Sequence, residues 1–314
     1  MDPVQHPQDS ALAEGVKDRG RAAGCNQMEI LLFTLGSGET FGINVFKVRE
    51  VSKAPKITPT PYAPRGVEGV ISLRGNVIPV IDLAAFVAPR AGAPRGATML
   101  VTEFNRHTQG FLVEAVDRIV RVDWDQVKQP EDIVAAEGNF ITALTRLPDG
   151  RLVSILDVEQ VLAVAFGEPA VPELAPLAAP MEGTLFFADD SGTARRMIVQ
   201  VLERLGARYQ QARNGAEAYA RLKAMADQAE RQGVPLKREL KLVLTDAEMP
   251  EMDGYVLTRQ LRADPRFDGV PVIMHSSLSS SANRALGQSA GVDAYVSKFD
   301  PTVLADTLRP YLSR

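Results

Sequence analysis

The pattern of apolar and polar residues changes on either side of residues 167–183. From 28 to about 166, short apolar and β-branched segments such as EILLFTL at 29–35 are separated by turns rich in glycine and proline. This pattern predicts many short strands and favours small β-barrels over a helical bundle. From 184 onward, apolar strands alternate with segments of helical spacing such as 193–205. Such alternation predicts an α/β domain with a parallel sheet.

The segments outside these two domains have compositions typical of chain that builds no core. Residues 1–27 carry charges but no apolar stretch of signal-peptide type, so we expect a flexible N-terminal tail. Residues 167–183 (GEPAVPELAPLAAPMEG) contain four prolines, and we interpret them as a semi-extended linker. The predicted domains are therefore 28–166 and 184–314.

Two local features are predicted within these domains. Val48 and Val51, followed by four prolines, suggest a brief helix and then an extended connection. In the second domain, Asn214 to Glu217 resembles a capping box that opens a helix. That helix and its loop continue through QAERQGVPLKREL, which indicates a surface insertion of several residues without chemistry of its own.

Polar residues stand at the ends of four predicted strands in the second domain. Asp246 follows LVLT, Asp189 and Asp190 follow TLFFA, and Ser276 and Lys298 follow two further apolar segments. A single aspartate after a strand is most often a turn former or a helix cap. The carboxyl ends of parallel strands, however, meet at one edge of the sheet, where ligands bind in open α/β folds. We therefore expect these side chains to converge.

The expected cluster has the chemistry of a phosphoryl site. Three neighbouring carboxylates repel one another and favour a divalent cation with oxygen ligands, of which Mg²⁺ fits best. Lys298 adds a fixed positive charge and Ser276 a hydroxyl donor, so the set could hold a phosphoryl group on Asp246. His275 precedes Ser276, and we expect it to pack in the core because imidazole nitrogen is not the ligand that a hard cation prefers.

These residues, with TDAEMPEMDG around Asp246, resemble a receiver domain of two-component signalling. The resemblance implies a CheY-like, flavodoxin-like fold with parallel sheet order 2-1-3-4-5, which is the strand order of flavodoxin and CheY. It implies that Asp246 accepts the phosphoryl group and that the switch residues include Tyr295. The implied metal ligands are Asp189, Asp190, Asp246 and the backbone carbonyl of Glu248. Phe299 stands where receivers commonly have proline after the lysine.

The first domain resembles the CheW coupling fold through INVFKVREV, GVISLRGNVIPVIDL and LVSILDVEQVL. This resemblance implies two five-stranded β-barrels and binding to chemoreceptors and to the histidine kinase CheA. Arg74 of the LRG motif would belong to the interaction surface, although a charged residue in a hairpin turn needs no function. Ile43, Val45 and Val48 could form an exposed apolar patch there or simply belong to the core.

Composition restricts the setting of the protein. The net charge of −4 provides no overall positive field for nucleic acid. The single cysteine, Cys25, suits a reducing, cytoplasmic location, and no apolar run approaches the roughly 20 residues that cross a bilayer.

The order of a coupling domain followed by a receiver resembles the CheV class of chemotaxis proteins. The resemblance implies a non-enzymatic adaptor between chemoreceptors and CheA, located at receptor arrays and regulated by phosphorylation of Asp246, with a role in adaptation. One alternative is a phosphate sink that drains phosphoryl groups from CheA, and the lifetime of phospho-Asp246 distinguishes it. Another is a constitutive scaffold whose receiver is inactive.

Overall fold

The computed structural model describes residues 27–87, 96–104, 107–128, 140–167, 170–276, 281–298 and 300–313. The chain divides into two compact units, Met1–Gly167 and Glu168–Arg314. Apart from Gln27, which begins the first strand, the predicted tail lies outside the described residues. The segment predicted as a linker falls almost entirely within the second unit.

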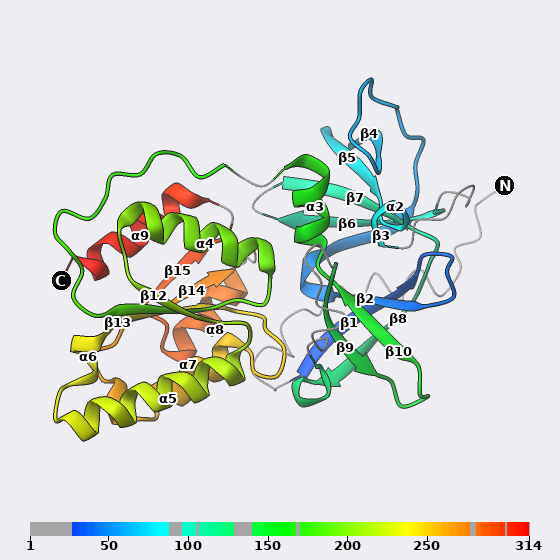
Figure 1. The fold of residues 1–314 in the computed structure, drawn as a ribbon. Helices are drawn as coiled ribbons and strands as arrows, with labels where there is room; N and C mark the ends of the chain where they lie inside the picture. The colour runs from blue at the N-terminus through cyan, green and yellow to red at the C-terminus, as the bar shows by residue number, and fades with distance from the viewer. Residues whose placement is uncertain are drawn as a thin grey trace. The chain divides into compact units, whose positions relative to one another are not determined.

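The described part of the first unit forms two five-stranded sheets, as expected for a CheW-like domain (Figure 1). One sheet contains, in spatial order, β8 (Ala115–Asp123), β1 (Gln27–Thr34), β2 (Thr40–Asn44), β10 (Leu152–Leu156) and β9 (Ile141–Arg146). The other contains β3 (Val48–Lys53), β6 (Thr98–Phe104), β7 (His107–Val113), β5 (Asn76–Asp82) and β4 (Val67–Leu73). The helical segments are η1 (Val45–Lys47), α2 (Ala84–Val87), η2 (Trp124–Gln126) and α3 (Val158–Phe166).

A shared apolar core joins the two sheets. Phe33 of β1 and Phe111 of β7 are fully buried in it, together with residues of α3. Ile43, Val45 and Val48 also lie in this core, so the suggested exposed patch is absent there. The brief helix predicted around Val48 is wrong, because Val48 begins β3 and only the preceding single turn, η1, is helical.

The second unit is a parallel sheet covered on both faces by helices (Figure 1). Its strands, in spatial order, are β12 (Tyr209–Ala212), β11 (Thr184–Ala188), β13 (Leu240–Asp246), β14 (Val272–Ser276) and β15 (Ala294–Ser297). The helices are α4 (Gly192–Leu205), α5 (Gly215–Gln232), α6 (Leu236–Glu239), α7 (Gly254–Arg262), η3 (Pro265–Phe267), α8 (Ser281–Ala290) and α9 (Pro301–Leu312).

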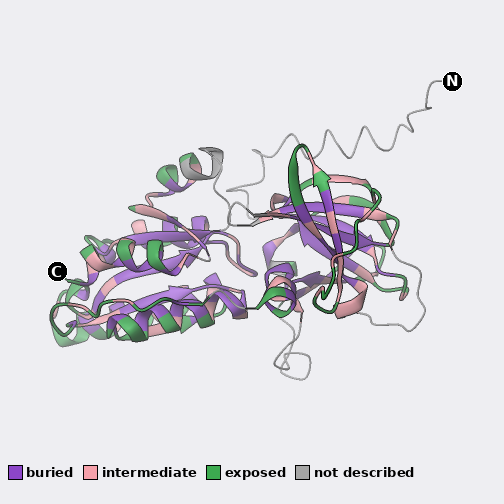
Figure 2. Ribbon diagram, turned by 90° about the horizontal axis from the view of Figure 1, so that it is seen from above, coloured by how far each residue is buried: buried purple, intermediate pink, exposed green. Residues whose placement is uncertain are grey.

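This order confirms the predicted 2-1-3-4-5 sheet, since every strand pair is parallel. Helices α4 and α9 pack on one face, and α5 and α7 pack on the other. In Figure 2, the outer faces of the helices are exposed, whereas the central strands β11, β13 and β14 are almost wholly buried and the edge strands β12 and β15 only partly so. The three central strands therefore meet solvent mainly at their ends, where ligands bind in open α/β sheets.

The predicted capping box is present at the start of α5. The Asn214 side chain accepts a hydrogen bond from the Glu217 amide at 2.7 Å, and the Glu217 carboxylate accepts one from the Arg213 amide at 2.9 Å. The expected insertion appears as the long helix α5 and the short helix α6. Arg266 of η3 holds this extension through an ion pair to Asp227 at 2.5 Å.

Residues 171–182, here called the strap, pack against the second unit and do not form the free tether that their composition suggested. Val171 and Met181 are buried in the core that α4 and α9 cover, and Leu177 packs against it. The Leu177 amide donates a hydrogen bond to the Leu205 carbonyl at 3.0 Å. Arg309 of α9 donates to strap carbonyls, one of them Pro176 O at 3.2 Å. The apolar residues between the prolines thus have a binding surface on their own receiver.

Candidate phosphoryl and metal site

The alternation of side chains along four neighbouring strands creates a polar row at the edge of the receiver sheet. Each strand places a buried apolar residue in the core beneath α4 and α9, and the residue two positions later is polar. Side chains two residues apart along a strand lie on the same face of the sheet. The polar groups therefore lie on the face that α4 and α9 cover, just beyond the apolar core. The pairs are Phe187 and Asp189, Leu244 and Asp246, Ile273 and His275, and Val296 and Lys298.

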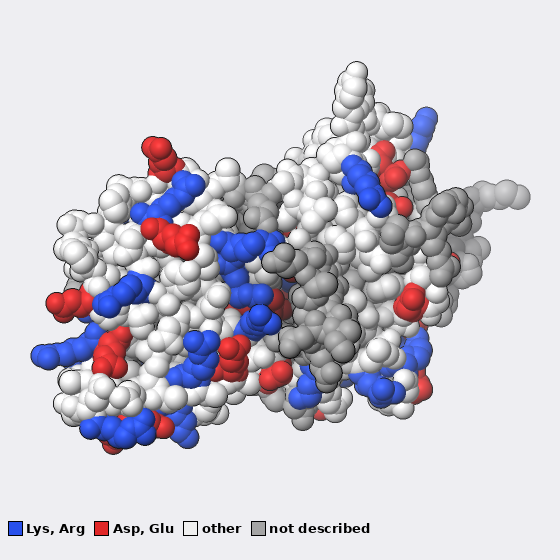
Figure 3. Space-filling model, viewed as in Figure 1, with Lys and Arg blue, Asp and Glu red and all other residues white. Residues whose placement is uncertain are grey.

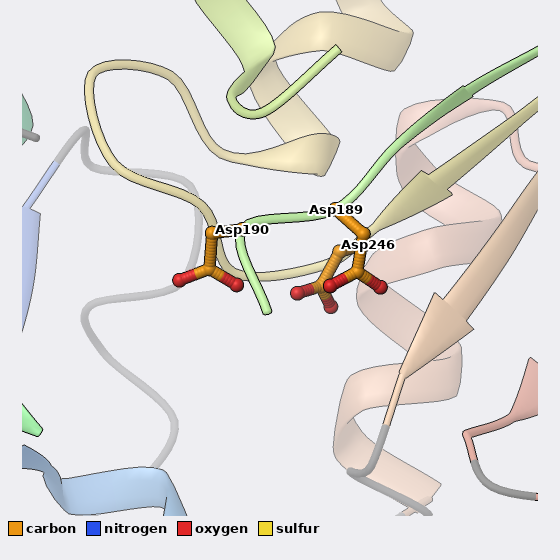
Figure 4. Close-up of side chains that lie close together, drawn as sticks. All are labelled: Asp189, Asp190 and Asp246. Atoms are coloured by element: carbon orange, nitrogen blue, oxygen red, sulfur yellow. The ribbon is translucent and has the colours of Figure 1, made fainter. Parts of the chain in front are cut away.

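Three carboxylates converge at this edge, as the sequence predicted. One oxygen from each of Asp189, Asp190 and Asp246 lies within 4.8 Å of the others. Figure 4 shows the three carboxylates pointing into the same space beyond the ends of β11 and β13. Asp189 and Asp246 are buried, whereas Asp190 is partly exposed. The cluster is therefore open to solvent through Asp190.

Lys298 reaches the cluster from β15 and bridges its two buried acids. Its Nζ lies 2.7 Å from Asp246 Oδ2 and 3.0 Å from Asp189 Oδ2, and the side chain is 2% exposed. A lysine at a strand end is usually solvated, but here the strand rows aim it inward. With all four groups ionised, three carboxylates and one ammonium leave a surplus of two negative charges.

The turn that carries Asp189 and Asp190 is fixed by neighbouring donors. The Ser191 amide donates to Asp189 Oδ1 at 3.0 Å, and Ser191 also caps α4. Arg195, one turn into α4, donates from Nη1 to the backbone carbonyls of Asp189 and Asp190, both at 2.8 Å. Sequence analysis did not identify Arg195, because its spacing is that of an ordinary helix residue.

Burial and charge act differently on the two inner acids. Burial by itself would raise the pKa of Asp189, but the Lys298 charge and the neighbouring His275 imidazole outweigh it and lower that pKa to about 2. Burial raises the pKa of Asp246 well above its usual value despite the attraction of Lys298, and the charges of Asp189 and Asp190 raise it further. Asp246 is therefore the carboxylate most in need of additional positive charge.

The donor set fits a magnesium ion. Mg²⁺ prefers a few carboxylate oxygens supplemented by water, and a partly exposed cluster with a double negative surplus supplies both conditions. Asp189, Asp190 and Asp246 would hold it. Glu248 follows Asp246 by two residues in the loop to α7, and coordination by its carbonyl stays a prediction. At Gly254 a Cβ would lie 1.9 Å from Asp246 O, so the start of α7 needs glycine to pack against the acceptor residue.

The remaining predicted receiver residues also lie near this edge. Ser276 is buried at the end of β14, and its carbonyl accepts a hydrogen bond from the Lys298 amide at 3.0 Å. Tyr295 is half-buried and packs on a small cluster that includes Tyr255 and Met274. Burial raises the pKa of Tyr295, so its hydroxyl stays protonated. The bond between Lys298 and Phe299 lies outside the described residues.

Arg74 occupies the predicted hairpin tip of the first unit. It is one of the two central residues of the turn between β4 and β5, where Leu73 pairs with Asn76. Arg74 and Gly75 have φ values of 50° and 86°, as in a type I′ hairpin turn. The guanidinium is 79% exposed and forms an ion pair with Glu50 of β3. Val77, at the start of β5, is 72% exposed.

On the face shown in Figure 3, positive and negative side chains are interspersed. None of the described helices has the length and apolar character needed to cross a membrane.

Comparisons with known proteins identify both units. The CheW-like domain family matches residues 29–166, and the response regulator receiver domain family matches residues 185–309. Chemotaxis protein CheV3 of Helicobacter pylori is 32% identical over 280 residues, covering 87% of this chain and 89% of that protein. Chemotaxis protein CheV2 of the same organism is 27% identical, covering 92% and 96%. The crystal structure of scaffolding protein TtCheW from Thermoanaerobacter tengcongensis is 29% identical, with a TM-score of 0.38, covering 41% of this chain and 88% of that one.

Proposed function

Because the chain belongs to the CheV family of chemotaxis proteins, we propose that residues 28–166 couple chemoreceptors to the histidine kinase CheA and that phosphorylation of Asp246 regulates this coupling. The protein would act as an adaptor at cytoplasmic receptor arrays, with a role in adaptation. The observation that carries the proposal is the buried bridge from Lys298 to Asp189 and Asp246.

The phosphoryl step follows from the positions of the side chains. An Asp246 carboxylate oxygen forms the new bond to phosphorus while the bond between phosphorus and the phosphohistidine nitrogen of CheA breaks. Burial raises the pKa of Asp246, and the Lys298 ammonium favours the ionised carboxylate that attacks. Bound Mg²⁺ would supply the positive charge that offsets the phosphoryl oxygens.

Phosphorylation would change the partners of nearby groups. The phosphoryl group adds about −1.5 to −2 charge units and three acceptor oxygens. Lys298, now shared between Asp189 and Asp246, is a donor beside it, and Ser276 ends the neighbouring strand β14. Tyr295 lies one strand away in the small cluster with Tyr255, so a shift of Ser276 would reach the packing around Tyr295 and α8.

For the coupling unit, we propose that Arg74 and Val77 belong to the surface that binds array partners. The same hairpin thus presents an exposed charge and an exposed apolar side chain, which suits a protein interface, in which Arg is enriched. The ion pair of Arg74 with Glu50 is also exposed, so it costs little to exchange Glu50 for an acidic group of a partner.

The decisive experiment mixes the full chain with Mg²⁺ and with CheA that carries a ³²P-labelled phosphohistidine. Wild type should take up the label, Asp246→Asn should take up none, and Asp268→Asn, an exposed receiver carboxylate, should behave as wild type. Label on the Asp246→Asn variant would refute the proposal.

Two further measurements separate the alternatives. Slow loss of the label from Asp246 indicates a regulatory state, whereas rapid loss indicates a phosphate sink. Cosedimentation with receptor and CheA, with and without phosphorylation, tests regulation directly. Arg74→Glu should reduce cosedimentation, and Arg118→Glu should not, although Arg118 also forms an exposed ion pair.

A further inference from the structure

His275 is a buried imidazole that no step of the proposed function uses. It lies in β14, is fully buried, and pairs in register with Asp246 of β13. Its Nδ1 is 3.5 Å from Asp189 Oδ2. The same strand row that aims Asp246 and Lys298 at the sheet edge therefore aims His275 there as well. The expectation that it packs in the core describes its burial but not this contact.

We propose that His275 is a positioning residue for Asp189, holding that carboxylate in the orientation that binds Mg²⁺. The inference rests on the proposed function, because it takes Asp189 to be a metal ligand. In this role His275 touches neither the metal nor the phosphoryl group. It would act through a hydrogen bond from Nδ1–H to Asp189 Oδ2, which forms if the 3.5 Å contact shortens slightly when the metal binds.

The other partners of Asp189 explain why a further donor is needed. Oδ1 accepts hydrogen bonds from the Ser191 amide, which belongs to the same turn, and from Lys298 Nζ at 3.1 Å. Oδ2 has Lys298 at 3.0 Å, but Lys298 is also 2.7 Å from Asp246 and would be drawn to a phosphoryl group there. His275 is then the partner of Oδ2 that phosphorylation does not recruit. Hydrogen bonds that orient ligating groups commonly change metal affinity by 10–100-fold.

The contact also defines the tautomer of the imidazole. A neutral histidine carries its proton on one nitrogen only, and an unprotonated Nδ1 would direct a lone pair at the carboxylate. The proposed role therefore requires the proton on Nδ1. This requirement separates positioning from plain packing, which would be indifferent to the tautomer.

Two substitutions distinguish the roles in the full chain. His275→Leu keeps an apolar side chain in the core but removes the donor. His275→Asn places an amide N–H close to the position of Nδ1 and so keeps the donor. We expect His275→Leu to raise the dissociation constant for Mg²⁺ about tenfold. Titration calorimetry on the unphosphorylated protein measures this constant. His275→Asn should stay within about threefold of wild type, and Asp189→Asn serves as the control that removes the site.

A spectroscopic measurement gives an independent readout. The chain has three histidines, so their imidazole ¹⁵N signals can be assigned by substitution. We expect Nδ1 of His275 to be protonated before and after Mg²⁺ is added. A proton on Nε2 alone would overturn the proposal, and this result decides the matter even where His275→Leu fails to fold.

The calorimetric outcomes are equally distinct. An unchanged Mg²⁺ affinity in His275→Leu would overturn the positioning role. Equal losses in the Leu and Asn variants would assign the effect to packing and overturn it too. If wild type itself bound no Mg²⁺, the metal site of the proposed function would fail as well, whereas normal wild-type binding with an unaffected Leu variant would remove only this inference.

Discussion

The ion pairs at the two candidate sites differ in their exposure to solvent. In the receiver, Lys298, Asp189 and Asp246 form ion pairs that are almost fully buried. In the coupling unit, Arg74 pairs with Glu50, and Arg118 with Asp149, in contact with water. Removing one partner of a buried pair leaves an uncompensated charge, whereas an exposed pair contributes little to stability. Substitutions at the receiver site should therefore change the free energy of unfolding strongly, whereas substitutions around Arg74 should change it little.

The largest expected effect tests the buried side of this contrast. Lys298→Met removes the ammonium from two buried carboxylates and should lower the free energy of unfolding of the receiver by about 3–5 kcal/mol without Mg²⁺. Urea unfolding at neutral pH measures it, with the exposed Lys223→Met as the control. A loss below about 1 kcal/mol would mean that the bridge is energetically equivalent to a surface pair.

A smaller effect concerns the strap. Met181 is 7% exposed in the receiver core, so Met181→Ala should cost about 2 kcal/mol in the unfolding of the second unit. Leu152→Ala in the coupling unit is the matched control, because Leu152 is 53% exposed. Equal, small effects of the two substitutions would show that residues 171–182 are the loose tether that their composition suggested.

Asp246→Asn should stabilise the receiver at neutral pH without Mg²⁺, by on the order of 1 kcal/mol, while abolishing phosphorylation. The pKa of Asp246 is raised in the folded protein, so folding favours its protonated form. The contribution of Asp246 to wild-type stability is therefore greatest at pH values below its pKa in the unfolded chain. It is lost as the pH rises through its pKa in the folded protein. The advantage of the variant should thus be absent in acid and appear as pH rises. Urea unfolding of both proteins from about pH 4 to about pH 8 tests this pH dependence. A variant less stable than wild type at neutral pH would contradict the prediction.

The smallest effect belongs to the coupling unit. Arg74→Ala should change the free energy of unfolding by less than about 1 kcal/mol, since its ion pair with Glu50 is exposed. Binding to receptor and CheA should nevertheless fall. Destabilisation of several kcal/mol would show that Arg74 is structural and remove the contrast between the two units.

The receiver site was predictable because its chemistry is tied to strand ends. Asp189, Asp190, Asp246 and Lys298 each follow an apolar strand, and a parallel sheet brings such positions together. The contact of His275 was not predicted, since a buried histidine usually packs against apolar neighbours. His275 nevertheless lies two residues after the core residue Ile273, and the two-residue period of a strand places its side chain at the same sheet edge as Asp246.

Other parts of the structure depended on tertiary contacts that a local pattern does not contain. The strap has a composition typical of a linker, and only the surface formed by α4 and α9 makes Val171 and Met181 core residues. Val48 and Val51 suggested a helix, but pairing with β6 makes them a strand. In the coupling unit, the hairpin at Arg74 was predicted from its Arg-Gly turn, whereas nothing in the pattern separated Ile43 and Val45 from a surface patch.

The backbone at Arg74 has an evolutionary consequence. Its φ of 50° is a left-handed conformation that asparagine and glycine adopt with less steric cost than arginine does. Mutational drift governed by folding alone would favour asparagine at this turn, giving the Asn-Gly sequence that type I′ hairpins prefer. Arg74→Asn should therefore stabilise the hairpin, and it should weaken binding to array partners if Arg74 has the binding role proposed above.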